Sequence, residues 1–194
     1  RYTDTQLLSL IEMQDFDVVF SAIEAACKSL DIPAETVLKE NSPGQFELNL
    51  YHQSDALLAA DQAFLLKRLI KGCAQQHGYI ATFMAKPFAQ WAGNGMHIHA
   101  SVLDHAGKNI FVLSDRTPQG AYARAIAGLL DATPQLLAFY APHANSYRRL
   151  VEGVTMAPTT LSWGLENRTS LVRLPLADPA ATRIEHRLAG ADAN

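Results

Sequence analysis

Residues 86–101 have the sequence KPFAQWAGNGMHIHAS, in which a loop of small residues leads into an alternating segment. Side chains along a strand point alternately to opposite faces, so His97, His99 and Ser101 are predicted to share one face. The intervening positions carry apolar side chains that we expect to face a core: Met96, Ile98, Ala100 and Val102. This segment therefore predicts a strand with one face built for ligands.

The composition limits the possible classes of protein. The chain has 194 residues, enough for one domain with a substantial core, and 48% of them are hydrophobic and 18% charged. A formal net charge of −3 gives no electrostatic footprint for nucleic acid. No apolar run approaches the roughly 20 residues of a membrane-spanning helix. We therefore expect a globular protein that binds neither nucleic acid nor membrane.

The two cysteines indicate a reducing environment. Cys27 and Cys73 lie in amphipathic, helix-like segments without metal-binding spacing, so we expect core thiols and a cytoplasmic protein. The chain begins at Arg1 without an initiator methionine and stops at Asn194 soon after a strand-like segment. We expect a piece of a longer protein.

Hydrophobic periodicity predicts helices alternating with strands. The expected helices follow Asp15, span 54–76, and span about 119–132, where Pro134 should break or restart the last one. The expected strands are 45–51, 79–85, 96–103, 171–174 and 183–188. This pattern predicts an α+β fold in which a curved antiparallel sheet, packed against helices, lines the site with its polar face.

Three segments place charged groups on a polar strand face. The first contains Glu40 and Glu47, and the second contains the histidines of 97–101. The third is the strand over 183–188, whose charged residues on one face are Arg183, Glu185 and Arg187. Six of the ten arginines fall between 148 and 187: Arg148, Arg149, Arg168, Arg173, Arg183 and Arg187.

Converging carboxylates would need a cation between them. Two like charges at ~4 Å repel by about 4 kcal/mol at an effective dielectric of 20, and a divalent ion removes that penalty. Glutamate and histidine ligands suit magnesium or manganese, while arginines bind carboxylate or phosphate. The residues alone predict an anion- and metal-binding site suited to phosphoryl chemistry. Solvated strand carboxylates, surface arginines and a plain Gly93-Asn94-Gly95 turn remain alternatives.

The same motifs resemble the catalytic domain of the glutamine synthetase family. Residues 86–101 are similar to that family's ATP-region signature, and 40–47 (ENSPGQFE) to its paired metal-ligand segment. Residues 145–150 (NSYRRL) resemble its glutamate-binding stretch, and 163–173 and 183–187 its closing motifs. The resemblance runs in order over nearly the whole chain.

The resemblance implies a role for each matching position. It implies metal ligation by Glu40, Glu47, His97 and Glu185, and ATP contacts by His99, Ser101, Arg173, Arg183 and Glu35. It implies that glutamate and its phosphorylated form are oriented by Gly93, Arg149, Arg168 and Arg187. The implied reaction uses ATP and Mg²⁺ or Mn²⁺: the glutamate γ-carboxylate is phosphorylated, and an amine then displaces phosphate to form a γ-amide.

Two departures from the family pattern bear on the amine. Thr155 stands where glutamine synthetases carry a glutamate that helps to bind ammonium, and Ala92 replaces the usual asparagine before Gly93. Both changes favour an amine larger than ammonia, and the phrases at 43–47, 157–159 and 189–194 resemble the γ-glutamylpolyamine synthetase (glutamate–putrescine ligase) branch. Alternatively, Thr155 reflects drift and Glu152 takes over as the base.

The resemblance also implies what lies outside this sequence. We find no upstream Glu-x-Glu strand, no amino-terminal β-grasp domain and no carboxy-terminal helices, so residues 1–194 are expected to be part of a catalytic domain and inactive alone. The full-length protein is expected to form a ring-type homo-oligomer with sites between subunits. A classical glutamine synthetase using ammonia, a non-catalytic structural relative and a metal-dependent hydrolase remain the alternatives.

Overall fold

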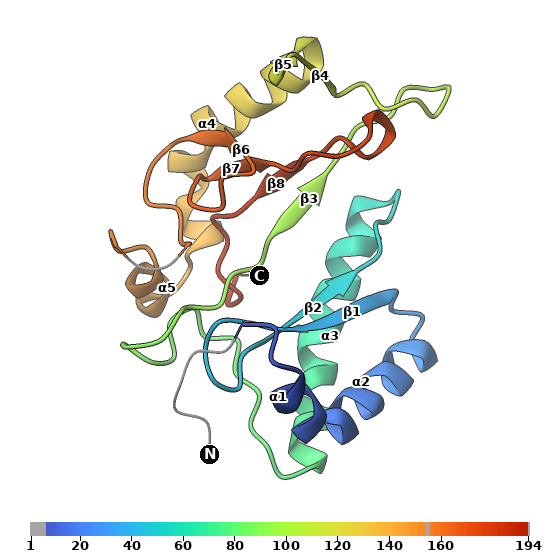
Figure 1. Ribbon diagram of the computed structural model, residues 1–194, viewed down its shortest axis with the longest axis vertical. Coiled ribbons are helices and arrows are strands. Elements are labelled where there is room, and N and C mark those ends of the chain that lie inside the picture. The colour runs from blue at the N-terminus through green and yellow to red at the C-terminus, as the bar shows by residue number, and fades with distance from the viewer. Residues whose placement is uncertain (1–6, 154–155, 194) are drawn as a thin grey trace. The chain divides into compact units, whose positions relative to one another are not determined.

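The computed structural model describes residues 7–153 and 156–193, and the chain divides into two compact units, Arg1–Phe83 and Met84–Asn194. Each unit is built from helices and short strands, as the α+β prediction requires (Figure 1). In this described part no helix has both the length and the apolar character needed to cross a membrane.

The first unit packs helices against a two-stranded hairpin. Its elements are α1 (Leu10–Asp15), α2 (Asp17–Ser29), β1 (Ala34–Lys39), β2 (Phe46–Leu50) and α3 (Ala56–Gln76). Strands β1 and β2 pair antiparallel, and alternation puts Leu48 and Leu50 against a core that contains Ile23 of α2 and Leu66 of α3. The expected alternation of 45–51 is therefore confirmed.

Local signals set the ends of α3. The side chain of Asp55 accepts hydrogen bonds from the backbone N–H groups of Leu57 and Leu58, at 2.9 and 3.2 Å, which caps the helix. Gly78 follows the helix with a φ of +78°, a conformation that glycine adopts without steric penalty. Cys27 of α2 and Cys73 of α3 are buried free thiols, as predicted.

The second unit is built around a four-stranded sheet. Its strands are β3 (Ile98–Ala100), β4 (Val112–Ser114), β5 (Thr117–Gln119), β6 (Trp163–Leu165), β7 (Val172–Leu174) and β8 (Ile184–His186). Its helices are α4 (Gly120–Tyr140), α5 (Ala144–Arg149) and the 3₁₀ turn η1 (Pro179–Ala181). The sheet has the order β3-β8-β7-β6, and β4 and β5 form a separate hairpin. Pairs β3–β8 and β7–β8 are antiparallel, but β6–β7 is parallel, so the sheet is mixed.

Helix α4 covers one face of this sheet (Figure 1). Tyr122 and Ile126 of α4 pack against Val172, Leu174 and Ile184, all at most 3% exposed. The core therefore occupies one face of β7 and β8, and the residues between these positions point to the other face.

Pro134 does not end α4, contrary to the sequence prediction. The helix continues through it to Tyr140, with Thr133 buried next to it. A proline inside a helix removes one backbone hydrogen bond, but packing of the apolar face against the sheet keeps the helix intact.

Two strand predictions were wrong. Residues 79–85 form no strand, and Ile80 is 96% exposed. The strand expected over 96–103 is confined to β3, and Ile98 and Val102 are more than 40% exposed rather than part of a core. An apolar or alternating run shows only that a strand is possible, because its formation requires a partner strand and a surface to cover it.

Candidate functional site

The polar face of the four-stranded sheet carries a row of charged residues. The register places His99 of β3 opposite Glu185 of β8, and Arg173 of β7 opposite Glu185 on its other side. Directly paired residues lie on the same face, so these three side chains form one row on the face that α4 does not cover. The sequence prediction of a polar sheet face is therefore confirmed for His99 and Glu185, and the structure adds Arg173 to the same face.

Glu185 is the centre of an ion-pair network. Its side chain is 2% exposed; Arg173 Nη1 donates to Oε2 at 2.7 Å, and Arg187 Nη1 donates to Oε1. Burial alone would raise the pKa of Glu185, but Arg187, Arg173 and His97 lower it below its usual value. The carboxylate therefore stays ionised although it is buried.

His97 lies next to this carboxylate as a neutral imidazole. Its Nδ1 is 3.3 Å from Glu185 Oε1, and burial together with the charge of Arg187 lowers the pKa of His97 to about 3. A neutral imidazole keeps one nitrogen lone pair, which is the form that binds metal. His97 and Glu185 thus offer one nitrogen and one oxygen donor. Their separation of 3.3 Å suits two neighbouring ligands of one hexacoordinate ion.

Arg149 of α5 bonds to the chain just after β8 and packs closely against the small-residue loop. The residue is 4% exposed, and it donates from Nη1 to Leu188 O at 2.8 Å and from Nη2 to Arg187 O at 3.0 Å. A Cβ atom on Gly95 would lie 2.7 Å from Arg149 Nη2, and one on Gly93 would lie 3.0 Å from Arg149 Cγ. The loop glycines are therefore required for close approach, and burial lowers the pKa of Arg149 to about 10.

The other candidates of this unit lie around the row. Arg183 Nε donates to His99 Nδ1 at 3.0 Å, which orients the imidazole. Ser101 is exposed and lies beyond the end of β3. Arg168 is exposed, and its backbone oxygen accepts from Arg187 Nε at 2.9 Å, so this contact is made by its backbone rather than by its guanidinium.

The hairpin of the first unit brings Glu40 and Glu47 to one face. Leu38 pairs with Glu47 and Lys39 with Phe46, so Lys39 and Phe46 share one face. Glu40 follows Lys39 and bonds through its N–H to Gln45 O, which directs it to the same side as Glu47. Glu35 lies at the irregularity between Ala34 and Thr36 and is exposed.

The donor set fits a hard divalent ion only in part. In residues 7–153 and 156–193 no three histidine, cysteine, aspartate or glutamate side chains are grouped closely enough to hold a metal. Each unit instead supplies two donors, Glu40 with Glu47 and His97 with Glu185. Carboxylate oxygens with one imidazole suit Mg²⁺ or Mn²⁺, and each oxygen of Glu185 retains a second lone pair beside its arginine hydrogen bond.

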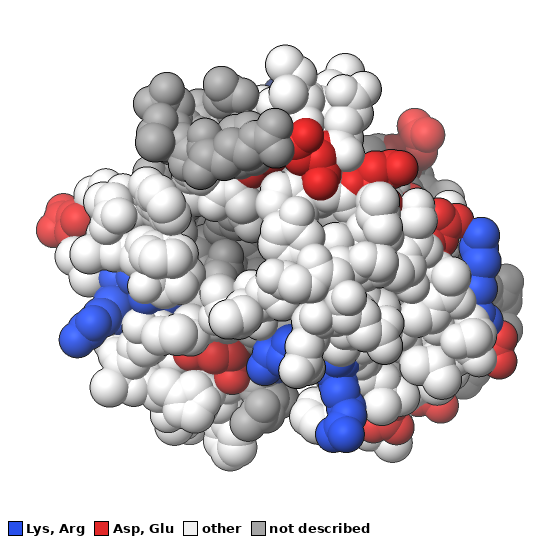
Figure 2. Space-filling view, turned by 90° about the horizontal axis from the view of Figure 1, so that it is seen from below, with Lys and Arg blue, Asp and Glu red and all other residues white. Residues whose placement is uncertain are grey.

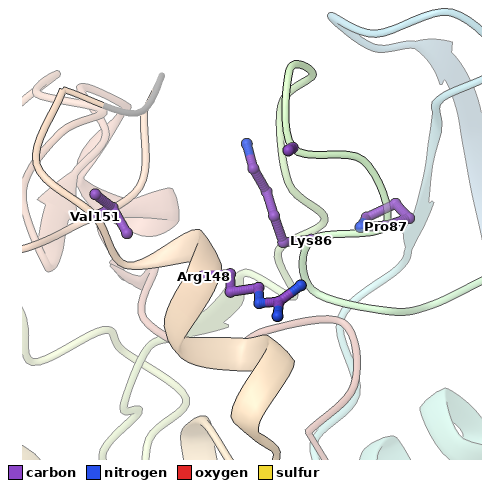
Figure 3. Close-up of a pocket in the computed structure, with 5 residues that line it drawn as sticks. Lys86, Pro87, Arg148 and Val151 are labelled. Carbon is purple, nitrogen blue, oxygen red and sulfur yellow. The ribbon is translucent and has the colours of Figure 1, made fainter.

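A shallow pocket of about 420 Å³ lies beside α5. It is lined by Lys86, Pro87, Ala89, Arg148 and Val151. The Lys86 ammonium donates to Trp91 O, and Figure 3 shows its side chain extending away from the guanidinium of Arg148. Burial lowers the pKa of Lys86. Lys86 thus stabilises the loop before Gly93 rather than pairing with Arg148 for one ligand.

Charged side chains outside these clusters are scattered. On the face shown in Figure 2, lysines and arginines lie in small separate groups, and most of that surface is uncharged. In the second unit, by contrast, His99, Glu185 and Arg173 lie side by side in one row on the polar face of the sheet.

The sequence analysis missed three residues that hold the candidates in place. Glu166 accepts from Arg173 Nη2 at 2.5 Å and adopts a φ of +51°. Glu12 and Lys39 form a buried pair in the first unit. The sequence signals were that Glu166 lies within the quoted motif 163–173 and that Lys39 directly precedes the motif 40–47. The partners themselves were not predictable, because a contact between residues apart in the chain leaves no local pattern.

Of the two residues that favour a larger amine, Ala92 is among the described residues and Thr155 is not. Ala92 precedes the loop glycines and is half-buried. Thr155 lies outside the described residues, so the substitution at this position is known from the sequence alone.

Comparison with known proteins shows the family. Residues 1–194 match the glutamine synthetase catalytic domain, and the chain belongs to this family. It is 42% identical over 194 residues to the gamma-glutamylputrescine synthetase PuuA of Escherichia coli (strain K12), a match that covers 100% of the chain and 41% of that protein. It is 35% identical over 190 residues to a glutamate–isopropylamine ligase of Pseudomonas sp, over 96% of the chain and 40% of that protein.

A solved structure shows the same fold. The structure described as a GmaS/ADP complex superposes with a TM-score of 0.84 at 36% identity, over 100% of this chain and 45% of that one. The chain spans about two fifths of the length of the curated relatives named above. The resemblance to the family that the motifs indicated is confirmed.

Proposed function

We propose that the protein is an ATP-dependent ligase that phosphorylates the γ-carboxylate of glutamate and joins it to an amine, with putrescine or another polyamine as the preferred acceptor. The observation that carries this proposal is the set of contacts around Glu185, where the neutral imidazole of His97 lies 3.3 Å from the buried carboxylate and Arg173 and Arg187 each donate a hydrogen bond to it. Such a site combines donors for a divalent ion with cations for carboxylate and phosphate.

In this proposal Glu40 and Glu47 would hold one Mg²⁺ or Mn²⁺, and His97 and Glu185 another. Bound metal neutralises the charge that develops on the transferred phosphoryl group. The two donors found in each unit support the assignment, and the remaining ligands of each metal would come from other parts of the full-length protein.

The arginines would bind the anionic groups. Arg149, Arg168 and Arg187 would orient glutamate together with Gly93, where a Cβ atom would lie 2.4 Å from Ala85 O and 3.0 Å from Arg149 Cγ. Arg173 and Arg183, with His99, Ser101 and Glu35, would contact ATP. The similar GmaS structure is a complex with ADP, which supports nucleotide binding by this chain. In this role Arg173 and Arg187 hold Glu185 ionised and present their remaining N–H groups to substrate oxygens.

The names of two relatives support an acceptor larger than ammonia, since one is a γ-glutamylputrescine synthetase and the other a glutamate–isopropylamine ligase. Two residues of the sequence also support a larger amine. Thr155 replaces the family's glutamate, whose carboxylate would favour ammonium, and Ala92 replaces the family's larger asparagine. We propose that a neutral, smaller side chain at 155 admits the carbon chain of the amine.

The experiment compares putrescine, isopropylamine and ammonia as acceptors for the full-length protein, with phosphate release as the readout. We expect the highest kcat/KM with putrescine. The matched variant Thr155→Glu should shift the preference toward ammonia, whereas Glu152→Gln should leave it unchanged. A clear preference of the unmodified protein for ammonia would contradict the polyamine assignment and favour a classical glutamine synthetase.

Residues 1–194 are proposed to be part of a catalytic domain whose sites are completed between subunits of a cytoplasmic homo-oligomer. The chain covers 41% and 40% of the two relatives named above, which supports its being part of a longer protein. We expect the 194-residue chain alone to have no measurable ligase activity. Turnover by the chain alone would contradict the proposal, and absence of turnover in the full-length protein would favour a non-catalytic relative.

A further inference from the structure

A buried ion pair lies in the first unit. Lys39 at the end of β1 and Glu12 in α1 face each other with Nζ and Oε2 3.5 Å apart, and their side chains are 0% and 1% exposed. Charged groups this deeply buried are rare unless they are paired and hydrogen-bonded, because removal from water penalises each of them.

The pair is bonded to the turn that joins β1 to β2. The ammonium of Lys39 donates to Glu40 O and, at 2.7 Å, to Ser42 O. The carboxylate of Glu12 accepts from the N–H of Gly44 through Oε1, while Oε2 has no hydrogen-bond partner and faces Lys39. Three backbone groups of a five-residue stretch are therefore held by two side chains that do not reach the surface.

This turn also sets the positions of Glu40 and Glu47. Gln45 N donates to Ser42 O at 3.0 Å, and Glu40 N donates to Gln45 O at 2.9 Å, which closes the turn between the two candidate ligands. Gly44 has a φ of +65°, which a glycine adopts without steric penalty, so the turn can bring its N–H to the carboxylate of Glu12. Lys39 points to the opposite face of the hairpin from Glu47, beside Phe46, with its Nζ 6.0 Å from the ring centroid.

We propose that Glu12 and Lys39 are positioning residues that hold the 40–45 turn so that Glu40 and Glu47 are preorganised to bind one divalent cation. The inference rests on the proposed function, because it assumes that these two glutamates are ligands. Neither Glu12 nor Lys39 touches the cation; both act through backbone groups of the turn. Residues that orient metal ligands in this way set metal affinity strongly, and their loss lowers it by about 10- to 100-fold.

A surface ion pair provides the matched control. Lys28 and Glu24 of α2 lie 2.7 Å apart in the same unit, but their side chains are 75% and 65% exposed and bond to no turn. If these ion pairs changed cation affinity only through the overall electrostatic field, removal of either pair would change that affinity equally.

The test uses the full-length protein and its affinity for Mn²⁺, measured by electron paramagnetic resonance without nucleotide. The double variant E12Q/K39M removes both charges but keeps a side-chain acceptor for Gly44, so no unpaired charge is left in the core. We expect its Mn²⁺ dissociation constant to rise 10- to 100-fold, while E24Q/K28M changes it less than twofold. At saturating Mn²⁺ the variant's kcat should approach the unmodified value, which a general loss of structure would not allow.

Two further measurements separate the possible failures. If E40Q/E47Q leaves Mn²⁺ affinity unchanged, the proposed metal ligands are wrong and the proposed function fails at this site. If E40Q/E47Q abolishes binding of one Mn²⁺ ion but E12Q/K39M binds that ion as tightly as the unmodified protein, only the positioning role is overturned.

Hydrogen exchange in the unmodified protein measures whether Glu12 holds the turn, and it does not require the double variant to fold. The Gly44 amide should exchange at least 100-fold more slowly than in an unstructured peptide of the same local sequence, because the buried carboxylate of Glu12 accepts its hydrogen bond. Rapid exchange at Gly44 would show that Glu12 does not hold the turn and would overturn the inference.

Discussion

In residues 7–83 the buried charges Glu12 and Lys39 lie on one face of a hairpin, and the candidate ligands Glu40 and Glu47 stand on the other. In residues 84–193 the candidate ligand Glu185 is itself buried and carries an arginine on each carboxylate oxygen. In the first unit the buried charges thus bond to the backbone of the turn between the candidate ligands, and in the second unit charges keep a candidate ligand ionised. Removing charge should therefore change geometry in the first unit and folding stability in the second.

The largest effect is expected for Glu185→Gln in the second unit. The substitution leaves Arg187, whose side chain is 5% exposed, without its countercharge. Loss of one partner from a buried ion pair destabilises proteins by about 3–5 kcal/mol, and we expect that decrease in the free energy of unfolding. Urea unfolding of the metal-free protein measures it.

Glu166→Gln is the matched control for this prediction. Glu166 also binds Arg173, but its side chain is 43% exposed. Exposed pairs contribute about 0–1 kcal/mol, so this variant should lose no more than that. Equal losses in the two variants would show that the burial of Glu185 is unimportant for the network.

His97 is expected to make the free energy of unfolding depend on pH. The change for one pH unit should be smaller than the loss expected for Glu185→Gln. The pKa of His97 is about 3 in the folded protein against an ordinary 6.5, so between these values the unfolded chain binds more protons. Stability should therefore fall with pH from 6.5 toward 3, by up to about 1.4 kcal/mol per pH unit, and be independent of this group above 6.5. Below 4.5 protonation of Glu185, whose pKa is lowered, removes stability further.

Urea unfolding of the metal-free protein at several pH values tests this prediction. Burial also lowers the pKa of His99 and His186, so His97→Gln should flatten the dependence without abolishing it. His105→Gln in an exposed turn serves as the control. An unchanged slope in His97→Gln would mean that the imidazole is not held neutral beside Arg187.

The smallest effect of the three concerns the loop glycines. In Gly95→Ala the new Cβ would lie 2.7 Å from Arg149 Nη2, an atom already bonded to Arg187 O. Overpacking of this kind destabilises by about 1–3 kcal/mol. Gly128→Ala, at an open position in α4, should instead stabilise by about 0.5–1 kcal/mol. Thermal unfolding compares the two, and a stable Gly95→Ala would show that Arg149 can retreat from the loop.

Much of the fold could be predicted because the relevant signals are local. The helix over 56–76 follows from apolar periodicity, the Asp55 cap and Gly78, and β2 follows from strict alternation. The failures at 79–85 and Pro134 have a common cause. Whether an apolar run pairs as a strand, or whether a helix survives a proline, depends on the surface that packs against it, and that surface comes from distant residues.

The sequence by itself determined the family, the α+β class and the residue types of the site, because spaced motifs and side-chain periodicity are properties of the chain. Only the tertiary structure decided which charges meet: that Glu185 lies between Arg173 and Arg187, that Arg149 is buried against the loop glycines, and that Glu12 reaches the turn at Gly44. The reason is physical. An ion pair or a close approach depends on distance in space, and partners such as Glu12 and Gly44, which are 32 residues apart, leave no periodic pattern in the sequence.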